Sequence, residues 1–277
     1  MIANWLITGD CHGDMTRFTY LNPEVDKPEE TAIIVLGDFS VNYFLNKRDI
    51  KTKQILADLG YTFYVVHGNH EARPNEDIAT LEYDEDVEGY VWVDKVNPKI
   101  KYFKIFGEYN IQGYEILVLG GAYSVDKYWR IMRAGGNTNP KICGWFSDEQ
   151  MTNAEREECL HMVKEHTDHY HIVLSHTCPL AYQPTDLFLP QINQSTVDNS
   201  TEEFLEDVRN IIAPYYKLWL WGHYHEDRIE SNRHIMLYRS ILSLKDVIRW
   251  TYLDDKYNMG KNRLHLPYRP LYQSIEE

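Results

Sequence analysis

A set of residues spread along the chain has side chains of the types that bind divalent metal ions. They are Asp10, His12, Asp38, Asn69, His70, His176, His223 and His225. If these residues meet in one crevice, the negative charges of the two carboxylates must be neutralised. Bound divalent metal ions would neutralise them and would also be coordinated by the histidine imidazoles. Oxygen and nitrogen ligands without a thiolate suit Mn, Fe or Zn. So many candidate ligands predict a centre of two metal ions.

The spacing of these residues strengthens the interpretation. Asp10 and His12 are separated by one residue, as are His223 and His225, so one short loop could present two ligands to the same metal or to adjacent ones. Taken singly, an aspartate or asparagine after a strand is usually a turn former. Because several such residues each follow a strand-like run, a shared metal site is the better interpretation. We expect Gly222 to permit a sharp turn that brings both imidazoles of the last pair to the metals.

The elements that must position these side chains are short apolar segments, most of which end in a candidate ligand. They read "NWLITGD", "TAIIVLGD", "TFYVVHGN", "YEILVLGG", "HIVLSH" and "YKLWLWGH". Such runs predict strands buried on both faces. Helical patterns lie between some of them, at 46–60, at 147–166 with a start at Ser147 or Asp148, and at 200–213. This alternation predicts one α/β domain over 1–277, whose ligands meet beyond the carboxyl ends of the strands.

Composition limits the classes of function. The 277-residue chain has a formal net charge of −14, which argues against extended contact with nucleic acid. The longest apolar runs fall far short of the roughly 20 residues that cross a bilayer, and the N-terminal "MIANWLITGDCHGD" has no basic leader. The four cysteines have no paired spacing, which predicts free thiols in a reducing cytoplasm.

Five motifs in a fixed order resemble the calcineurin-like metallophosphoesterase superfamily. They are "GDCHGD" (9–14), "LGDFS" (36–40), "HGNHEAR" (67–73), "LSHTCP" (174–179) and "WGHYHED" (221–227). The resemblance implies a four-layer αββα sandwich of two mixed β-sheets flanked by helices. It places a dimetal site at the C-terminal ends of the strands. The segment around 121–146 would then be a loop insertion at the edge of the active site.

The resemblance also implies roles for the ligands. One metal would be held by Asp10, His12 and His225, the other by Asn69, His176 and His223. Asp38 would bridge the two metals, and a hydroxide between them would attack phosphorus without a covalent enzyme intermediate. His70 would donate a proton to the leaving oxygen or stabilise charge there, or it would only orient a ligand. Mn is the expected metal, with Fe, Zn, Co or Ni as alternatives.

The expected activity is phosphodiester or phosphomonoester hydrolysis on a small or nucleotide-like substrate. The alternatives are a non-catalytic metal-binding scaffold of the same fold and a nuclease. Asp38 is followed by "FSVNYFLN" and not by the Asp-Arg-Gly of Ser/Thr protein phosphatases. This departure disfavours the protein-phosphatase branch and the branch that hydrolyses symmetrical diadenosine tetraphosphate.

Three cations are candidate substrate contacts. Arg73 could bind phosphate or be a surface ion-pair partner, and Lys127 and Arg130 could form a basic rim or face solvent. The acidic segment 75–94 is predicted to be a solvated face that could also narrow access. The C-terminal "YRPLYQSIEE" could be a surface strap, a dimer contact or a loose tail, and the oligomeric state is open.

Overall fold

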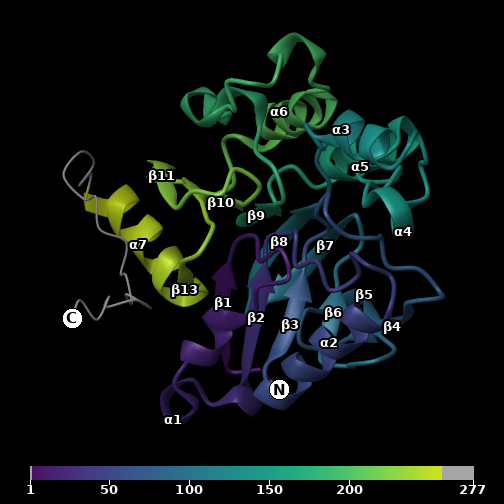
Figure 1. The fold of residues 1–277 in the computed structure, drawn as a ribbon. Coiled ribbons are helices and arrows are strands. Elements are labelled where there is room, and N and C mark those ends of the chain that lie inside the picture. Colours follow the sequence, from purple (N-terminus) through teal and green to yellow (C-terminus); the bar gives the residue numbers. More distant parts are fainter. Residues whose placement is uncertain (1, 258–277) are drawn as a thin grey trace, which may run out of the picture.

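The structure is a computed structural model that describes residues 2–257 (Figure 1). The C-terminal "YRPLYQSIEE" therefore lies outside the described residues, and its predicted roles stay predictions. Within the described part, no helix combines the length and the apolar character needed to cross a membrane.

Two mixed β-sheets form the centre of the fold. In spatial order, the seven-stranded sheet consists of β13 (Ile241–Ser243), β1 (Asn4–Thr8), β2 (Thr31–Val35), β3 (Thr62–Val65), β6 (Ile100–Tyr102), β5 (Gly89–Asp94) and β4 (Ala79–Asp84). The six-stranded sheet consists of β11 (Arg228–Ser231), β12 (His234–Met236), β10 (Leu218–Trp221), β9 (Ile172–Ser175), β8 (Tyr114–Leu119) and β7 (Phe106–Ile111). The central strands β1, β2, β3 and β6 run parallel, as do β8, β9, β10 and β12.

Each central strand buries both of its faces, as the continuous apolar runs predict. In β2, Ile34 packs into the core between the sheets, whereas Ile33 and Val35 pack on the outer face. In β10, Leu220 faces the other sheet and Trp219 faces outward into a third apolar cluster. Three apolar layers therefore separate four layers of secondary structure, which confirms the predicted sandwich.

Helices cover the outer faces. The helix α2 (Lys47–Leu59) contributes Leu56 to the cluster outside the seven-stranded sheet. The helices α5 (Asn153–Glu165) and α6 (Ser200–Ile212) cover the six-stranded sheet, and α7 (Leu244–Tyr257) packs against β1 and β13. The remaining helices are short: α1 (Pro23–Asp26), α3 (Lys127–Arg133) and α4 (Pro140–Cys143). The last two lie within the segment 121–146.

Two expectations about these elements were wrong in detail. The helix α5 starts at Asn153 and not near Ser147, because Thr152 and Glu155 form a reciprocal capping box at its N-terminus. The acidic segment 75–94 is the β4–β5 hairpin and is only partly a solvated face. Its residues Asp84 and Asp94 are buried and form ion pairs of 2.5 Å with Lys101 and Lys53.

Candidate metal centre

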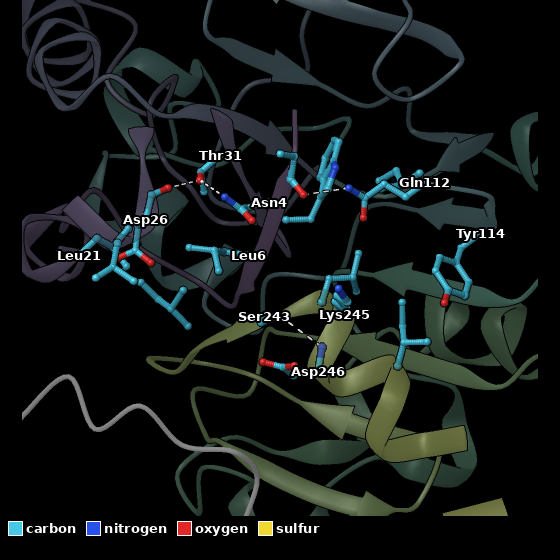
Figure 2. Close-up of a pocket in the computed structure, with 17 residues that line it drawn as sticks. Asn4, Leu6, Leu21, Asp26, Thr31, Gln112, Tyr114, Ser243, Lys245 and Asp246 are labelled. Atoms are coloured by element: carbon cyan, nitrogen blue, oxygen red, sulfur yellow. Dashed lines mark hydrogen bonds between the residues drawn. The ribbon is translucent and has the colours of Figure 1, made fainter. Parts of the chain in front are cut away.

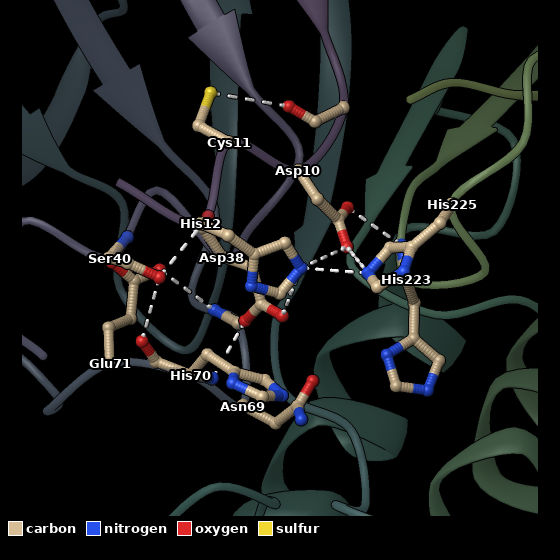
Figure 3. A network of polar contacts seen from close by, with 12 residues as sticks. Asp10, Cys11, His12, Asp38, Ser40, Asn69, His70, Glu71, His223 and His225 are labelled. Carbon is tan, nitrogen blue, oxygen red and sulfur yellow. Dashed lines mark hydrogen bonds and ion pairs between the residues drawn. The ribbon is translucent and has the colours of Figure 1, made fainter. Parts of the chain in front are cut away.

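The candidate ligands lie on loops that follow the carboxyl ends of parallel strands in both sheets (Figure 3). Asp10 follows β1, Asp38 follows β2, and Asn69 follows β3 in the larger sheet. His176 comes directly after β9, and the His223–His225 loop follows β10 in the smaller sheet. Because neighbouring parallel strands end at the same edge, residues far apart in sequence meet there.

One group consists of Asp10, His12 and His225, whose ligand atoms all lie within 4.8 Å of one another. The Nε2 atoms of His12 and His225 are 2.7 Å apart, and Asp10 Oδ2 is 3.3 Å from the latter. Asp10 is fully buried, and its Oδ2 has no hydrogen-bond donor among the described residues. Two imidazole nitrogens and a buried carboxylate oxygen that face each other are a donor set suited to a cation.

A second group consists of Asp10, Asp38 and His176. The His176 Nδ1 lies 2.8 Å from the Leu36 carbonyl and donates its proton there, which turns Nε2 towards the cluster. That Nε2 lies 2.8 Å from Asn69 Oδ1 and 3.5 Å from Asp38 Oδ1, so three electron-pair donors converge. Asp38 also joins a third group with His12 and His70, and it therefore lies between the two sets of ligands.

His223 is placed less directly than the other predicted ligands. Its backbone N–H donates to Asp10 Oδ1 at 2.8 Å, and its ring centroid lies 5.0 Å from that of His176. The ring points away from the His12–His225 pair (Figure 3). The structure therefore brings the His223 imidazole near the His176 side of the cluster but into none of the three groups found among residues 2–257.

Burial and the neighbouring charges shift the pKa values of several candidate ligands. Burial raises the pKa of Asp10, but the interactions with His12 and His225 outweigh it and hold the pKa well below its ordinary value. Burial likewise opposes ionisation of Asp38, and the charges of His176 and His70 shift its pKa downward. Burial lowers the pKa of His223 to about 3. The pKa of His12 shifts the other way, because the Asp10 and Asp38 carboxylates outweigh the effect of burial and raise it.

The backbone of the ligand loops is strained. His12, Asp38, His223 and His225 have φ angles of 48°, 47°, 70° and 57°, in the left-handed region that non-glycine residues rarely adopt. Each such residue costs about 1–3 kcal/mol, and residues of this kind cluster at functional sites. The fold therefore stores strain at four of the predicted ligands.

Three glycines leave room for ligands from other loops. A Cβ atom on Gly37 would lie 2.1 Å from His176 Nδ1, and one on Gly68 would lie 2.2 Å from Asp38 Oδ1. A Cβ on Gly222 would lie 2.2 Å from Asp10 Oδ1. The chain turns tightly after Gly222, since the Tyr224 N–H donates to the Gly222 carbonyl at 2.9 Å, but the φ angle of Gly222 itself is not in the left-handed region. Its role is to let Asp10 approach the backbone closely.

Replacing Gly222 by alanine is expected to displace the Asp10 carboxylate and weaken Mn²⁺ binding at least about tenfold, the scale of losing support around a ligand. Calorimetric titration of metal-stripped protein with Mn²⁺ measures this. Gly135→Ala is the control, because no atom of the described residues lies within 4 Å of the Cβ added there, although its φ of 67° makes the backbone less tolerant of alanine than that of Gly222. Unchanged Mn²⁺ affinity in Gly222→Ala would contradict the assignment.

Residues that the sequence did not reveal hold the ligands in place. Asn69 Nδ2 donates to Ser124 Oγ at 2.9 Å, and Ser124 Oγ donates to the buried Glu149 at 2.5 Å. This chain turns the amide oxygen of Asn69 towards His176. The buried Arg17 donates to the Asp10 carbonyl at 2.7 Å and fixes the first ligand loop. No motif spacing signals these partners.

His70 lies beside the cluster and contacts Arg130. Its backbone N–H donates to Asp38 Oδ1 at 2.7 Å. Arg130 Nη2 lies 2.8 Å from His70 Nδ1, and its Nη1 donates to the Gly144 carbonyl at 2.6 Å. Burial lowers the pKa of His70, and the Arg130 charge adds to that shift while Asp38 opposes it. Arg130 therefore reaches the site through His70.

The other two predicted substrate contacts lie elsewhere. Arg73 forms an ion pair of 2.7 Å with Glu155, and it lines a separate cavity with His67. The Lys127 ammonium lies 4.3 Å from the centroid of the Trp145 ring. The structure does not bring either cation to the metal cluster.

A cavity of about 300 Å³ opens onto the cluster. Asp38, Asn69, His70, His223 and His225 line one end of it, and no residue of 75–94 lines it. A larger cavity of about 400 Å³ lies beside β1 and the start of α7 (Figure 2). None of the candidate ligands lines that cavity, so size alone does not identify the functional site.

Comparison with known proteins gives a family match. The model of the family described as calcineurin-like phosphoesterase matches residues 4–227. No curated protein matches the sequence. Two similar solved structures are TT1561 of Thermus thermophilus (17% identity, 89% of this chain and 96% of that chain, TM-score 0.46) and the phosphopantetheinyl hydrolase PptH from Mycobacterium tuberculosis (12% identity, 85% and 88%, TM-score 0.41).

Proposed function

The chain belongs to the calcineurin-like phosphoesterase family of phosphoester hydrolases, and on this premise we propose that it hydrolyses phosphate esters of small or nucleotide-like molecules with two divalent metal ions. The observation that carries the proposal is the buried cluster in which ionised Asp10 and Asp38 meet the nitrogens of His12, His176 and His225. Such a donor set is costly without cations.

The residues present fit a pair of metal ions. We propose that Asp10, His12 and His225 hold one ion and that Asn69, His176 and His223 hold the other, with Asp38 shared. Bound metal ions of this kind supply a hydroxide nucleophile at neutral pH and neutralise the phosphoryl oxygens. Mn is the proposed metal, with Fe, Zn, Co or Ni as alternatives that fit the same donors.

The chain's own contribution beyond the ligands centres on His70. The Asp38 carboxylate and the Arg130 guanidinium hold its backbone and its ring at the cavity wall. We propose that the neutral ring donates a hydrogen bond to the leaving oxygen and stabilises the charge that develops there, which a group at this position can do only if it is fixed within hydrogen-bond reach. Arg130 is proposed to position His70 and not to bind phosphate directly.

The test compares metal-stripped protein with protein reloaded with Mn²⁺, on an aryl phosphomonoester and on a bis-aryl phosphodiester. Turnover that appears with Mn²⁺ and disappears with a chelator is the expected result, and the ratio of the two rates assigns monoesterase or diesterase. Two bound metal ions without turnover of either ester at any pH would overturn the proposal and favour the scaffold alternative. Oligonucleotide cleavage with steep salt dependence would instead indicate the nuclease.

We also propose a cytoplasmic location. The support is that Cys11, Cys143, Cys159 and Cys178 are all buried free thiols.

A further inference from the structure

The cavity at the metal cluster continues away from the ligands along the segment 183–199, which the sequence did not single out. This segment contains the short 3-10 turns Thr185–Leu187 and Gln194–Thr196. Gln183 Nε2 donates to Asn199 Oδ1 at 3.2 Å and ties the two ends of the segment together. The segment is therefore a closed surface loop of the kind that often carries function.

The wall that this loop gives to the cavity is apolar. It consists of Leu187, Phe188, Leu189, Ile192 and Val197. None of these side chains is fully buried, and Leu189 is 50% exposed. Apolar side chains that stay partly exposed around one cavity mark a surface for an apolar ligand.

An aromatic pair connects this wall to the ligand loop. The Phe188 ring lies nearly parallel to the Tyr224 ring, with centroids 6.5 Å apart. Tyr224 stands between His223 and His225, and its hydroxyl accepts a hydrogen bond from Thr177 at 3.2 Å. The organic group of a phosphoester whose phosphoryl group lies at the metal ligands would therefore meet this aromatic pair.

The charged residues around the cavity are acidic. Beyond the metal cluster they are Asp126, Asp198 and Glu202, and among the described residues that line the cavity there is no lysine or arginine. Glu202 is 4% exposed, and its Oε2 has no hydrogen-bond partner among them. Asp126 is paired with Arg130 at 2.7 Å, and burial raises the pKa of Glu202 to about 7. A second phosphate on the substrate would lose water and find no lysine or arginine on the described cavity lining to replace it, which costs binding free energy.

Resting on the proposed function, we propose that the substrate is a phosphoester whose organic group is largely apolar, carries no second phosphate and lies against Leu187, Phe188 and Leu189. The cavity lining, which has no lysine or arginine among its described residues, excludes nucleoside di- and triphosphates and other polyphosphates as substrates. The apolar wall supplies the affinity for the organic group, and a lining whose described residues include no lysine or arginine supplies the discrimination against a second phosphate.

The test measures binding by phosphonates, which are not hydrolysed, to the Mn²⁺-loaded full chain by calorimetric titration. Hexylphosphonate is expected to bind at least about tenfold more tightly than methylphosphonate, because its methylene groups leave water. Hexane-1,6-diyl bisphosphonate, which carries a second phosphonate at the far end, is expected to bind no more tightly than methylphosphonate. Equal binding of the three compounds would overturn the proposal.

A matched pair of variants locates the contact. Leu189→Asn is expected to weaken hexylphosphonate binding several-fold and to leave methylphosphonate binding unchanged. Leu180→Asn is the control, because Leu180 is 38% exposed but does not line the cavity. An equal effect of both variants would contradict the assignment. If the binding order held but no ester were hydrolysed, the proposed function would fail while the cavity assignment stood.

Discussion

Replacing Asp38 by asparagine is expected to lower kcat/KM for an aryl phosphoester by about a thousandfold or more, a loss of roughly 4 kcal/mol of transition-state stabilisation. Asp38 is 1% exposed, lies in two of the three candidate groups, as Asp10 does, and is the carboxylate proposed to be shared by both metal ions. Asparagine keeps the shape and an oxygen that can accept the His70 N–H, but it removes the negative charge. The fold should therefore survive while the centre loses its bridge.

Steady-state kinetics with Mn²⁺-loaded protein, together with metal content after dialysis, measures the effect. Asp49→Asn is the control, because Asp49 is 5% exposed but accepts hydrogen bonds from Phe44 and Leu45, away from the cluster. The control should retain wild-type turnover. Unaltered turnover and metal content in Asp38→Asn would sink both the bridging role and the proposed dimetal mechanism.

Replacing Lys53 by methionine is expected to lower the free energy of unfolding by about 3–5 kcal/mol, because it leaves Asp94 buried without its ion-pair partner. Lys53 Nζ lies 2.5 Å from Asp94 and donates to Asn42 Oδ1 at 2.6 Å. Tyr102 donates to the same carboxylate at 2.8 Å. The network joins α2 to β5, β6 and the loop after Asp38.

Urea unfolding of the metal-free protein measures this loss. Lys27→Met is the control, since its pair with Glu30 is exposed at both side chains and should contribute less than about 1 kcal/mol. Equal stability of the two variants would contradict the buried-network argument. A Lys53→Met protein of normal stability would mean that Asp94 takes up a proton or water at little cost.

The positions of the central strands and the convergence of the candidate ligands could be predicted from the sequence. The runs that become β1, β2, β3, β9 and β10 are apolar on both faces, and only a sheet covered on both sides can bury them. Residues placed just after such strands must meet at one edge. The positions of Asp10, Asp38 and His176 follow from that rule together with the motif order.

What could not be predicted depends on contacts between segments that are remote in the chain. Ser124 orients Asn69 from 55 residues away, and Arg130 reaches His70 from 60 residues away. Asp84 and Asp94 read as solvent-facing charges because the lysines that neutralise them are not beside them in sequence. The apolar residues of the loop 183–199 have no regular period, so nothing local signals that they form a cavity wall.

The contact between His12 and His225 joins residues that are 213 positions apart. Closing so long a loop costs conformational entropy. The packing of the core must offset this cost before the two histidines can meet. The complete donor set therefore does not exist in a nascent chain that ends before β10. A metal ion that binds only the native ensemble would then stabilise it by mass action, about 2.7 kcal/mol at a hundred times the dissociation constant. Metal supply would thus govern the lifetime of the molecule as well as its chemistry.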